Sequence, residues 1–104
     1  MSTKQDHKRW RKQFNEDCLK RDNNKCRFCN DTDDLDVHHI IDRHEMPNGG
    51  YVMSNGVTVC NVHHNLCEDW HRGGGGIVAF SPIEVFKAIG SSYEQALEDS
   101  KNLK

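Results

Sequence analysis

Apolar residues recur every four positions near the beginning of the chain, at Trp10, Phe14 and Cys18. Residues spaced by four lie on the same face of an α-helix, so this spacing predicts an amphipathic helix with a buried apolar side. Many of the other positions in this segment are polar, and several of them are lysine or arginine. We therefore expect residues 1–25 to form a basic N-terminal helix.

Two short segments further along the chain have the pattern of β-strands. Side chains alternate between the two faces of a strand, so the neighbours His38 and His39 in Leu35–Ile41 would point to opposite faces. The β-branched run Val57–Val59 predicts a second strand. Residues 42–54 between them form a connection that is long for a hairpin, and long loops near sites often contact substrate.

A helix is expected directly after the second strand. Asn61 belongs to the residue types that cap helix N-termini. His64 and Glu68 follow at a spacing of four and would share one face of that helix. His71 stands three residues further on, where it would be a metal neighbour, a phosphate contact or a helix-end residue interacting with the dipole.

The last quarter of the chain, residues 81–104, predicts a C-terminal helical segment of two short helices. Ser81 and Glu84 have the spacing of a capping box, with proline at the first helical position, and Gly90 is expected to end this helix. A second helix is expected to restart at residues 91–94. The segment is acidic on balance, so we expect it to support the fold or contact a partner, and not to bind nucleic acid.

Length and composition predict one small domain over residues 1–104. Only 35% of the 104 residues are hydrophobic, so the core is modest and a bound metal is expected to be necessary for folding. Short strands with flanking helices predict an α+β fold. No run approaches the length of a membrane span and no segment resembles a targeting peptide, so we expect a soluble cytoplasmic protein.

Four residues have the spacing of a structural zinc site: Cys26, Cys29, Cys60 and His63. Two pairs, each with two intervening residues, supply the tetrahedral ligand set that zinc requires. Disulfides or buried thiols are the competing interpretation, which the odd number of five cysteines and the lack of a signal peptide disfavour. Cys67 or His64 stays open as the fourth ligand, and His63 is preferred because it preserves the spacing.

A second group of ligand residues is interleaved with these pairs. His38, His64 and Glu68 would converge on one divalent ion if the first strand packs against the helix. Imidazole and carboxylate ligands that leave positions open for water or substrate are typical of a catalytic metal.

The chain resembles the His-Asn-His (HNH) endonucleases, whose ββα-metal motif packs a two-stranded hairpin on one helix. The resemblance rests on four ordered segments: Cys26–Cys29, Leu35–Ile41, Asn55–Cys60 and His63–His64. It implies a zinc-bound ββα-metal core over residues 26–72. The final pair of the motif is commonly Cys-His in this family, and here it is His-His.

The resemblance also implies a role for each residue of the site. His38 and His64 would ligate the catalytic ion, and Glu68 sits where related proteins place a third ligand. His39 would be the general base, and Asn55 would be the middle Asn that braces the loop between the strands.

The implied activity is metal-dependent DNA cleavage that leaves 5′-phosphate and 3′-hydroxyl ends. The cofactors would be a structural Zn²⁺ and a catalytic Mg²⁺, Mn²⁺ or Ni²⁺. One motif cuts one strand, so double-strand cleavage would need a homodimer, two sequential nicks or a partner enzyme. The alternative is a noncatalytic zinc module that binds nucleic acid or protein. The joint presence of His38, His39, Asn55 and His64 disfavours it, because zinc alone would need only the cysteines and one histidine.

Charge is distributed unevenly along the chain. The net charge is −2, yet residues 1–29 contain nine Lys or Arg against four Asp or Glu, whereas residues 30–104 contain five against twelve. Four cations are predicted to contact nucleic acid: Arg9, Arg11, Lys12 and Arg43. Arg43 comes shortly after the histidine pair, near the expected reaction centre. For the residues before Trp10, a solvated basic face is an equally good interpretation.

Overall fold

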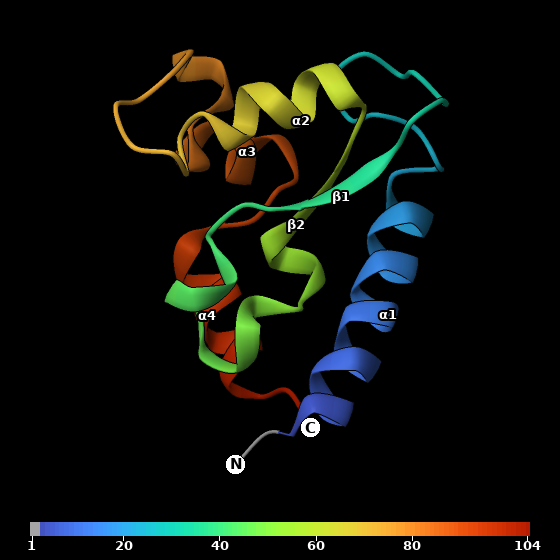
Figure 1. Ribbon diagram of the computed structural model, residues 1–104, viewed down its shortest axis with the longest axis vertical. Coiled ribbons are helices and arrows are strands. Elements are labelled where there is room, and N and C mark those ends of the chain that lie inside the picture. The colour runs from blue at the N-terminus through green and yellow to red at the C-terminus, as the bar shows by residue number, and fades with distance from the viewer. Residues whose placement is uncertain (1–2) are drawn as a thin grey trace.

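The computed structural model describes residues 3–104, and within them four α-helices surround a two-stranded sheet (Figure 1). Strands β1 (Asp36–His39) and β2 (Gly56–Val59) are antiparallel, and His38 stands opposite Val57. Helix α2 (Asn61–Glu68) begins two residues after β2 and contacts both strands. The α+β class predicted from the sequence is therefore confirmed.

Helix α1 (Lys4–Arg21) buries Trp10, Phe14 and Cys18, which confirms the predicted apolar face. It begins with a capping box in which the Thr3 hydroxyl accepts from the Asp6 N–H. The helix ends at Arg21, four residues earlier than predicted, because Asn23 and Asn24 have φ values of 57° and 55° that no helix contains. Residues 1–2 of the predicted helix lie outside the described part of the chain.

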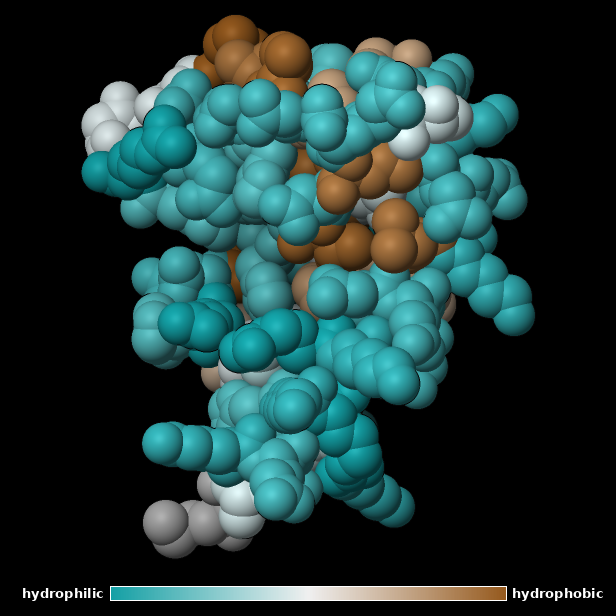
Figure 2. All heavy atoms as spheres, turned by 45° about the vertical axis from the view of Figure 1, so that its right-hand side comes forward, coloured by the Kyte–Doolittle hydropathy of each residue, from teal (hydrophilic) through white to brown (hydrophobic). Residues whose placement is uncertain are grey.

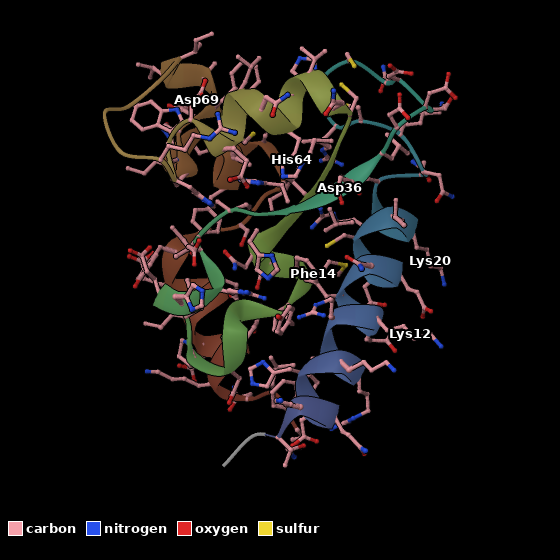
Figure 3. All side chains as sticks on the ribbon, in the orientation of Figure 1. Lys12, Phe14, Lys20, Asp36, His64 and Asp69 are labelled. Atoms are coloured by element: carbon pink, nitrogen blue, oxygen red, sulfur yellow. The ribbon has the colours of Figure 1, made fainter. Side chains whose placement is uncertain are left out.

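Glycine at position 56 brings α1 close to the sheet. A Cβ atom on Gly56 would lie 2.5 Å from the Phe14 ring and 2.6 Å from the Cys18 sulfur, which no side chain tolerates. In Figure 3, Phe14 points from α1 toward the middle of the molecule, while Lys12 and Lys20 lie on the outer side of the helix. The sheet thus separates an α1 core from a second core built with α2 and with helices α3 (Pro82–Ala88) and α4 (Tyr93–Lys101).

A buried carboxylate joins the end of α1 to β2. Asp22 accepts hydrogen bonds from Arg21 at 2.8 Å, from Arg27 at 3.2 Å and from the backbone N–H of Thr58 at 3.0 Å. Burial raises the pKa of Asp22, but the hydrogen bonds from Arg21 and Thr58 outweigh it and hold the pKa below 3.8. The carboxylate is therefore charged in the folded protein throughout the neutral range.

Replacing Asp22 with Asn should lower the free energy of unfolding by about 2 kcal/mol, because two guanidinium partners lose their charged acceptor. The folded pKa is depressed, so this contribution is complete above the unfolded pKa of about 3.9 and is lost only in stronger acid. Urea denaturation of both proteins should give the same difference at every pH from 5.5 to 8. An Asp17→Asn change on the more exposed side of α1 is the control, and a difference that shrinks within this range would contradict the assignment.

The connection between the strands is built of short 3₁₀ turns at Arg43–Glu45, Pro47–Gly50 and Met53–Asn55. Helix α4 (Tyr93–Lys101) packs against this connection and lies behind it in Figure 1. The Asn48 side chain donates to the Ser100 carbonyl at 2.8 Å, and the Ser54 hydroxyl donates to Asp99 at 2.7 Å. The acidic C-terminal segment thus supports the loop, which is one of the two roles expected for it.

Helix α3 (Pro82–Ala88) has proline at its first position as predicted, but the capping box does not form. Glu84 pairs with Lys87 at 3.5 Å instead of returning to Ser81. The helix also ends at Ala88, two residues before Gly90, while α4 begins after a Ser92 cap. Within residues 3–104, no helix is long and apolar enough to cross a membrane.

Candidate metal centres

The outer group of predicted ligands is assembled at the junction of the Cys knuckle, the end of β2 and the start of α2. The sulfur of Cys29 lies 3.7 Å from that of Cys60, and the sulfur of Cys26 lies 3.6 Å from Nδ1 of His63. All four ligand atoms are within 4.8 Å of one another. A tetrahedral zinc ion with ordinary bond lengths separates two sulfurs by about 3.8 Å and a sulfur from a nitrogen by about 3.6 Å. The cluster fits zinc.

Backbone N–H groups favour the thiolate form of two of these sulfurs. Burial raises the pKa of Cys26, but N–H groups of Cys60, Phe28 and Cys29 oppose it, and the net pKa lies below 9.0. The N–H of His63 chiefly lowers the pKa of Cys60 in the same way. Deprotonated sulfur is the form that binds metal, so the local backbone is arranged for that state.

The structure decides among the three candidates for the fourth ligand. His63 supplies Nδ1 to the cluster, and its ring packs against Phe28 and Phe80 at centroid distances of 5.6 and 5.5 Å. His64, one residue later, turns toward β1. Cys67 is buried, and burial raises the pKa of its thiol to about 12, so it remains a neutral packing residue. All five cysteines are free of disulfides.

The inner group brings β1 and α2 together. Glu68 Oε1 lies 3.2 Å from His38 Nδ1 and 3.3 Å from His64 Nε2, and the three ligand atoms are all within 4.8 Å of one another. Ligands about 2.1 Å from one ion are separated by about 3.0 Å in octahedral geometry and about 3.4 Å in tetrahedral geometry. The observed spacings fall between these values, so the three side chains fit a shared divalent ion.

His38 carries the clearest mark of a metal ligand. Its side chain is 3% exposed, and the buried Nδ1 atom makes no hydrogen bond even though Glu68 is close. Burial, and then repulsion from His71, His64 and the next histidine, lowers the pKa of His38 to about 3. The imidazole is therefore neutral at pH 7, and a shared ion would give the buried Nδ1 atom the partner that it lacks in the structure.

His39 points to the other face of β1, as the strand pattern predicts. Its ring packs on Phe14 at 4.6 Å and edge-on against Tyr51 at 5.1 Å. Burial lowers the pKa of His39 to about 4, and Asp42 and the Gly49 backbone oppose this shift. Its Nε2 atom is buried without a hydrogen-bond partner. A neutral imidazole thus stands next to the inner group without belonging to it.

Asn55 holds the two ends of the inter-strand loop together. Its side-chain oxygen accepts from the Ile41 N–H at 2.9 Å, and its amide group donates to the carbonyls of Ile41 at 3.1 Å and Gly50 at 3.2 Å. Asn55 is fully buried, and a Cβ on Gly50 would lie 2.7 Å from its amide nitrogen. Asn55 therefore acts through the backbone and contacts no metal-ligand side chain in either group.

Two further side chains lie against the inner group: Asp36, to which the sequence assigned no role, and His71, for which a metal neighbour was one of three expectations. Asp36 Oδ2 is 3.3 Å from His64 Nδ1, and Asp36 shares a strand face with His38 because the two are separated by two positions. His71 stacks on His38 at 4.9 Å, and its Nε2 lies 3.0 Å from the Ile40 carbonyl. A cavity of about 280 Å³ opens beside His71. It is lined in part by Asp42, His44, Glu45 and Trp70.

The four cations predicted to contact nucleic acid are placed differently. Arg11 donates to the Tyr51 hydroxyl at 3.2 Å, one ring away from His39, and Arg43 is exposed and close enough to His39 to lower its pKa. Arg9 pairs with Asp6 on the outer part of α1, and Lys12 points away from the sheet (Figure 3). The structure thus brings Arg11 and Arg43 to the histidine and leaves the other two on the helix surface.

Comparison of the chain with models of protein families, with curated proteins and with solved structures finds no match. The chemistry of the two groups therefore rests on their own geometry.

Proposed function

We propose that the protein is a metal-dependent endonuclease of the HNH type, which hydrolyses phosphodiester bonds in DNA. The observation that carries the proposal is that two adjacent histidines of β1 have different surroundings. His38 faces the His64 and Glu68 ligand atoms, whereas the adjacent His39 faces away and keeps a neutral imidazole. A metal-binding histidine next to an uncoordinated neutral histidine is compatible with a single-metal nuclease, and the chain order β1, β2, α2 is that of a ββα motif.

In the proposed reaction, the neutral imidazole of His39 accepts a proton from a water molecule whose oxygen attacks the phosphorus. The bond from phosphorus to the 3′ oxygen breaks, and the leaving oxygen takes a proton from solvent, which gives 5′-phosphate and 3′-hydroxyl ends. A divalent ion on His38, His64 and Glu68 would supply charge stabilisation for the phosphoryl and leaving oxygens. Asn55 keeps the chain around His39 in place through its backbone hydrogen bonds.

The charge around the site is compatible with a polyanionic substrate. Arg11 and Arg43 are the cations nearest His39, and their guanidinium groups suit bidentate contacts with phosphates. In Figure 2, where the α1 side is turned toward the reader, the lower part of the surface is almost entirely hydrophilic. The outer zinc centre would have a structural role, because its four protein ligands leave no open position.

The proposal predicts that zinc-loaded protein nicks supercoiled plasmid when Mg²⁺, Mn²⁺ or Ni²⁺ is added after loosely bound metal has been chelated. A His38→Ala variant should lose at least about 100-fold in rate, because one of the three ligands is missing. His44→Ala is the matched control, since His44 is exposed and lies outside both ligand groups. Gel electrophoresis of the plasmid forms gives the rates. Equal cleavage by wild type and His38→Ala would exclude this metal centre as the catalyst.

A further inference from the structure

The imidazole of His64 lies between two carboxylates, one at each ring nitrogen. Nε2 lies 3.3 Å from Glu68 Oε1, on the side of the inner ligand group. Nδ1 lies 3.3 Å from Asp36 Oδ2, on the opposite side of the ring. In Figure 3, Asp36 on β1 lies just below and to the right of His64, which belongs to α2. The two nitrogens therefore meet different surroundings.

This geometry assigns the two nitrogens to different tasks. Only Nε2 is turned toward Glu68 and His38, so Nε2 is the nitrogen that would ligate an ion in the inner group. A neutral histidine that ligates through Nε2 must carry its proton on Nδ1, and that proton needs an acceptor. The Asp36 carboxylate is positioned to accept it.

We propose that Asp36 is a positioning residue for the catalytic metal, which orients His64 by accepting the hydrogen bond from its Nδ1–H. The inference rests on the proposed function. It adds a residue from outside the ligand group, because Asp36 contacts the nitrogen of His64 that faces away from Glu68. A carboxylate in this place holds the ring in one orientation and one tautomer and makes Nε2 a better donor to a metal.

The strand register explains how Asp36 reaches this position. Asp36 pairs with Val59, the last residue of β2, and α2 begins two residues later at Asn61. The first residue of β1 therefore lies next to the first turns of α2, where His64 is found. Because side chains alternate along a strand, Asp36 and His38 share a face, so β1 supplies both a ligand and the partner of another ligand.

The contact contributes little to folding, which makes the inference testable by substitution. The Asp36 side chain is 66% exposed and that of His64 is 26% exposed, so water competes for this contact. Loss of the carboxylate is therefore expected to leave the fold and the outer zinc centre unchanged. Metal affinity at the inner group is the property that should change.

Calorimetric titration of Mn²⁺ into zinc-loaded protein tests this directly. Mn²⁺ is the weakest competitor among the divalent transition metals and does not displace zinc. We expect Asp36→Ala to weaken Mn²⁺ binding by about 10- to 100-fold. Asp36→Asn should be intermediate, because its amide oxygen is an uncharged acceptor, and Asp33→Ala in the preceding exposed loop should match wild type. Unchanged affinity in Asp36→Ala would overturn the assignment.

The tautomer of His64 gives a second readout that needs neither Mn²⁺ nor activity. In nitrogen-15 spectra of the zinc-loaded protein, the fraction of His64 that is protonated on Nδ1 should be higher in wild type than in Asp36→Ala, where the carboxylate at Nδ1 is gone and that of Glu68 at Nε2 remains. An equal fraction protonated on Nδ1 in the two proteins would overturn the role of Asp36. If wild type shows no Mn²⁺ binding, the proposed catalytic ion fails, and the tautomer alone then decides whether Asp36 orients His64.

Discussion

Removing zinc from the outer centre should unfold the protein, and Cys26→Ser should prevent the folded state from accumulating. The four ligands connect the knuckle, the end of β2 and the start of α2, which are the segments that position the inner group. A zinc site of this kind contributes about 10–16 kcal/mol, which equals or exceeds the whole stability of a typical domain. A chain of 104 residues whose core is divided by the sheet has no other contribution to stability of comparable size.

Circular dichroism and zinc content, measured together during titration with a chelator, provide the test. Zinc loss and loss of helical signal should coincide. Cys18→Ala is the matched control, because Cys18 is also buried but belongs to α1 and not to the outer ligand group, and burial raises the pKa of its thiol to about 12. That variant should retain zinc and lose only about 1–2 kcal/mol of stability by cavity formation. A folded Cys26→Ser protein with full zinc content would show that the outer centre is assigned wrongly.

Replacing His39 with Ala should lower the rate of plasmid cleavage by about 10²- to 10⁴-fold, the usual contribution of a general base. The outer zinc and Mn²⁺ binding at the inner group should be retained, because His39 supplies no ligand atom to either group. The cleavage rate, the zinc content and the Mn²⁺ affinity are measured on the same preparation, with His44→Ala as the control.

The His39 ring packs on Phe14 and Tyr51, so its removal affects packing as well as catalysis. The two effects must be separated. Imidazole added to the Ala variant should enter the space that the side chain leaves and restore part of the activity as an external base. A variant that stays folded, binds Mn²⁺ and cleaves at the wild-type rate would remove His39 from the mechanism. Loss of the fold would mean that its role is structural.

Local spacing along the chain was sufficient for several features of the molecule. The four-residue repeat of Trp10, Phe14 and Cys18 placed the buried face of α1 correctly, because helical geometry alone decides which positions share a face. The same geometry put His64 and Glu68 together, and the alternation of a strand separated His38 from His39. These relations span a few residues and need no knowledge of the rest of the fold.

Element ends were less predictable, because they depend on hydrogen bonds that compete with the local pattern. The capping box expected at Ser81 does not form, since Glu84 finds Lys87 on the next turn. Asn61 lies inside α2 as its first residue, and Cys60 occupies the cap position instead. Helix α1 ends at Arg21 because the next residue, Asp22, accepts a hydrogen bond from the backbone N–H of Thr58. Thr58 lies on β2, 36 positions later in the chain.

The sequence by itself determined which residue types are available for two metal groups and which neighbours in the chain share a face. Only the tertiary structure decided that His63 joins Cys26, that His64 turns to Asp36, and that Arg11 reaches the Tyr51 ring beside His39. Those contacts join segments 28 to 40 residues apart. They depend on how closely α1 packs over Gly56 and on the register of β1 with β2, which are properties of packing between elements and not of any one segment.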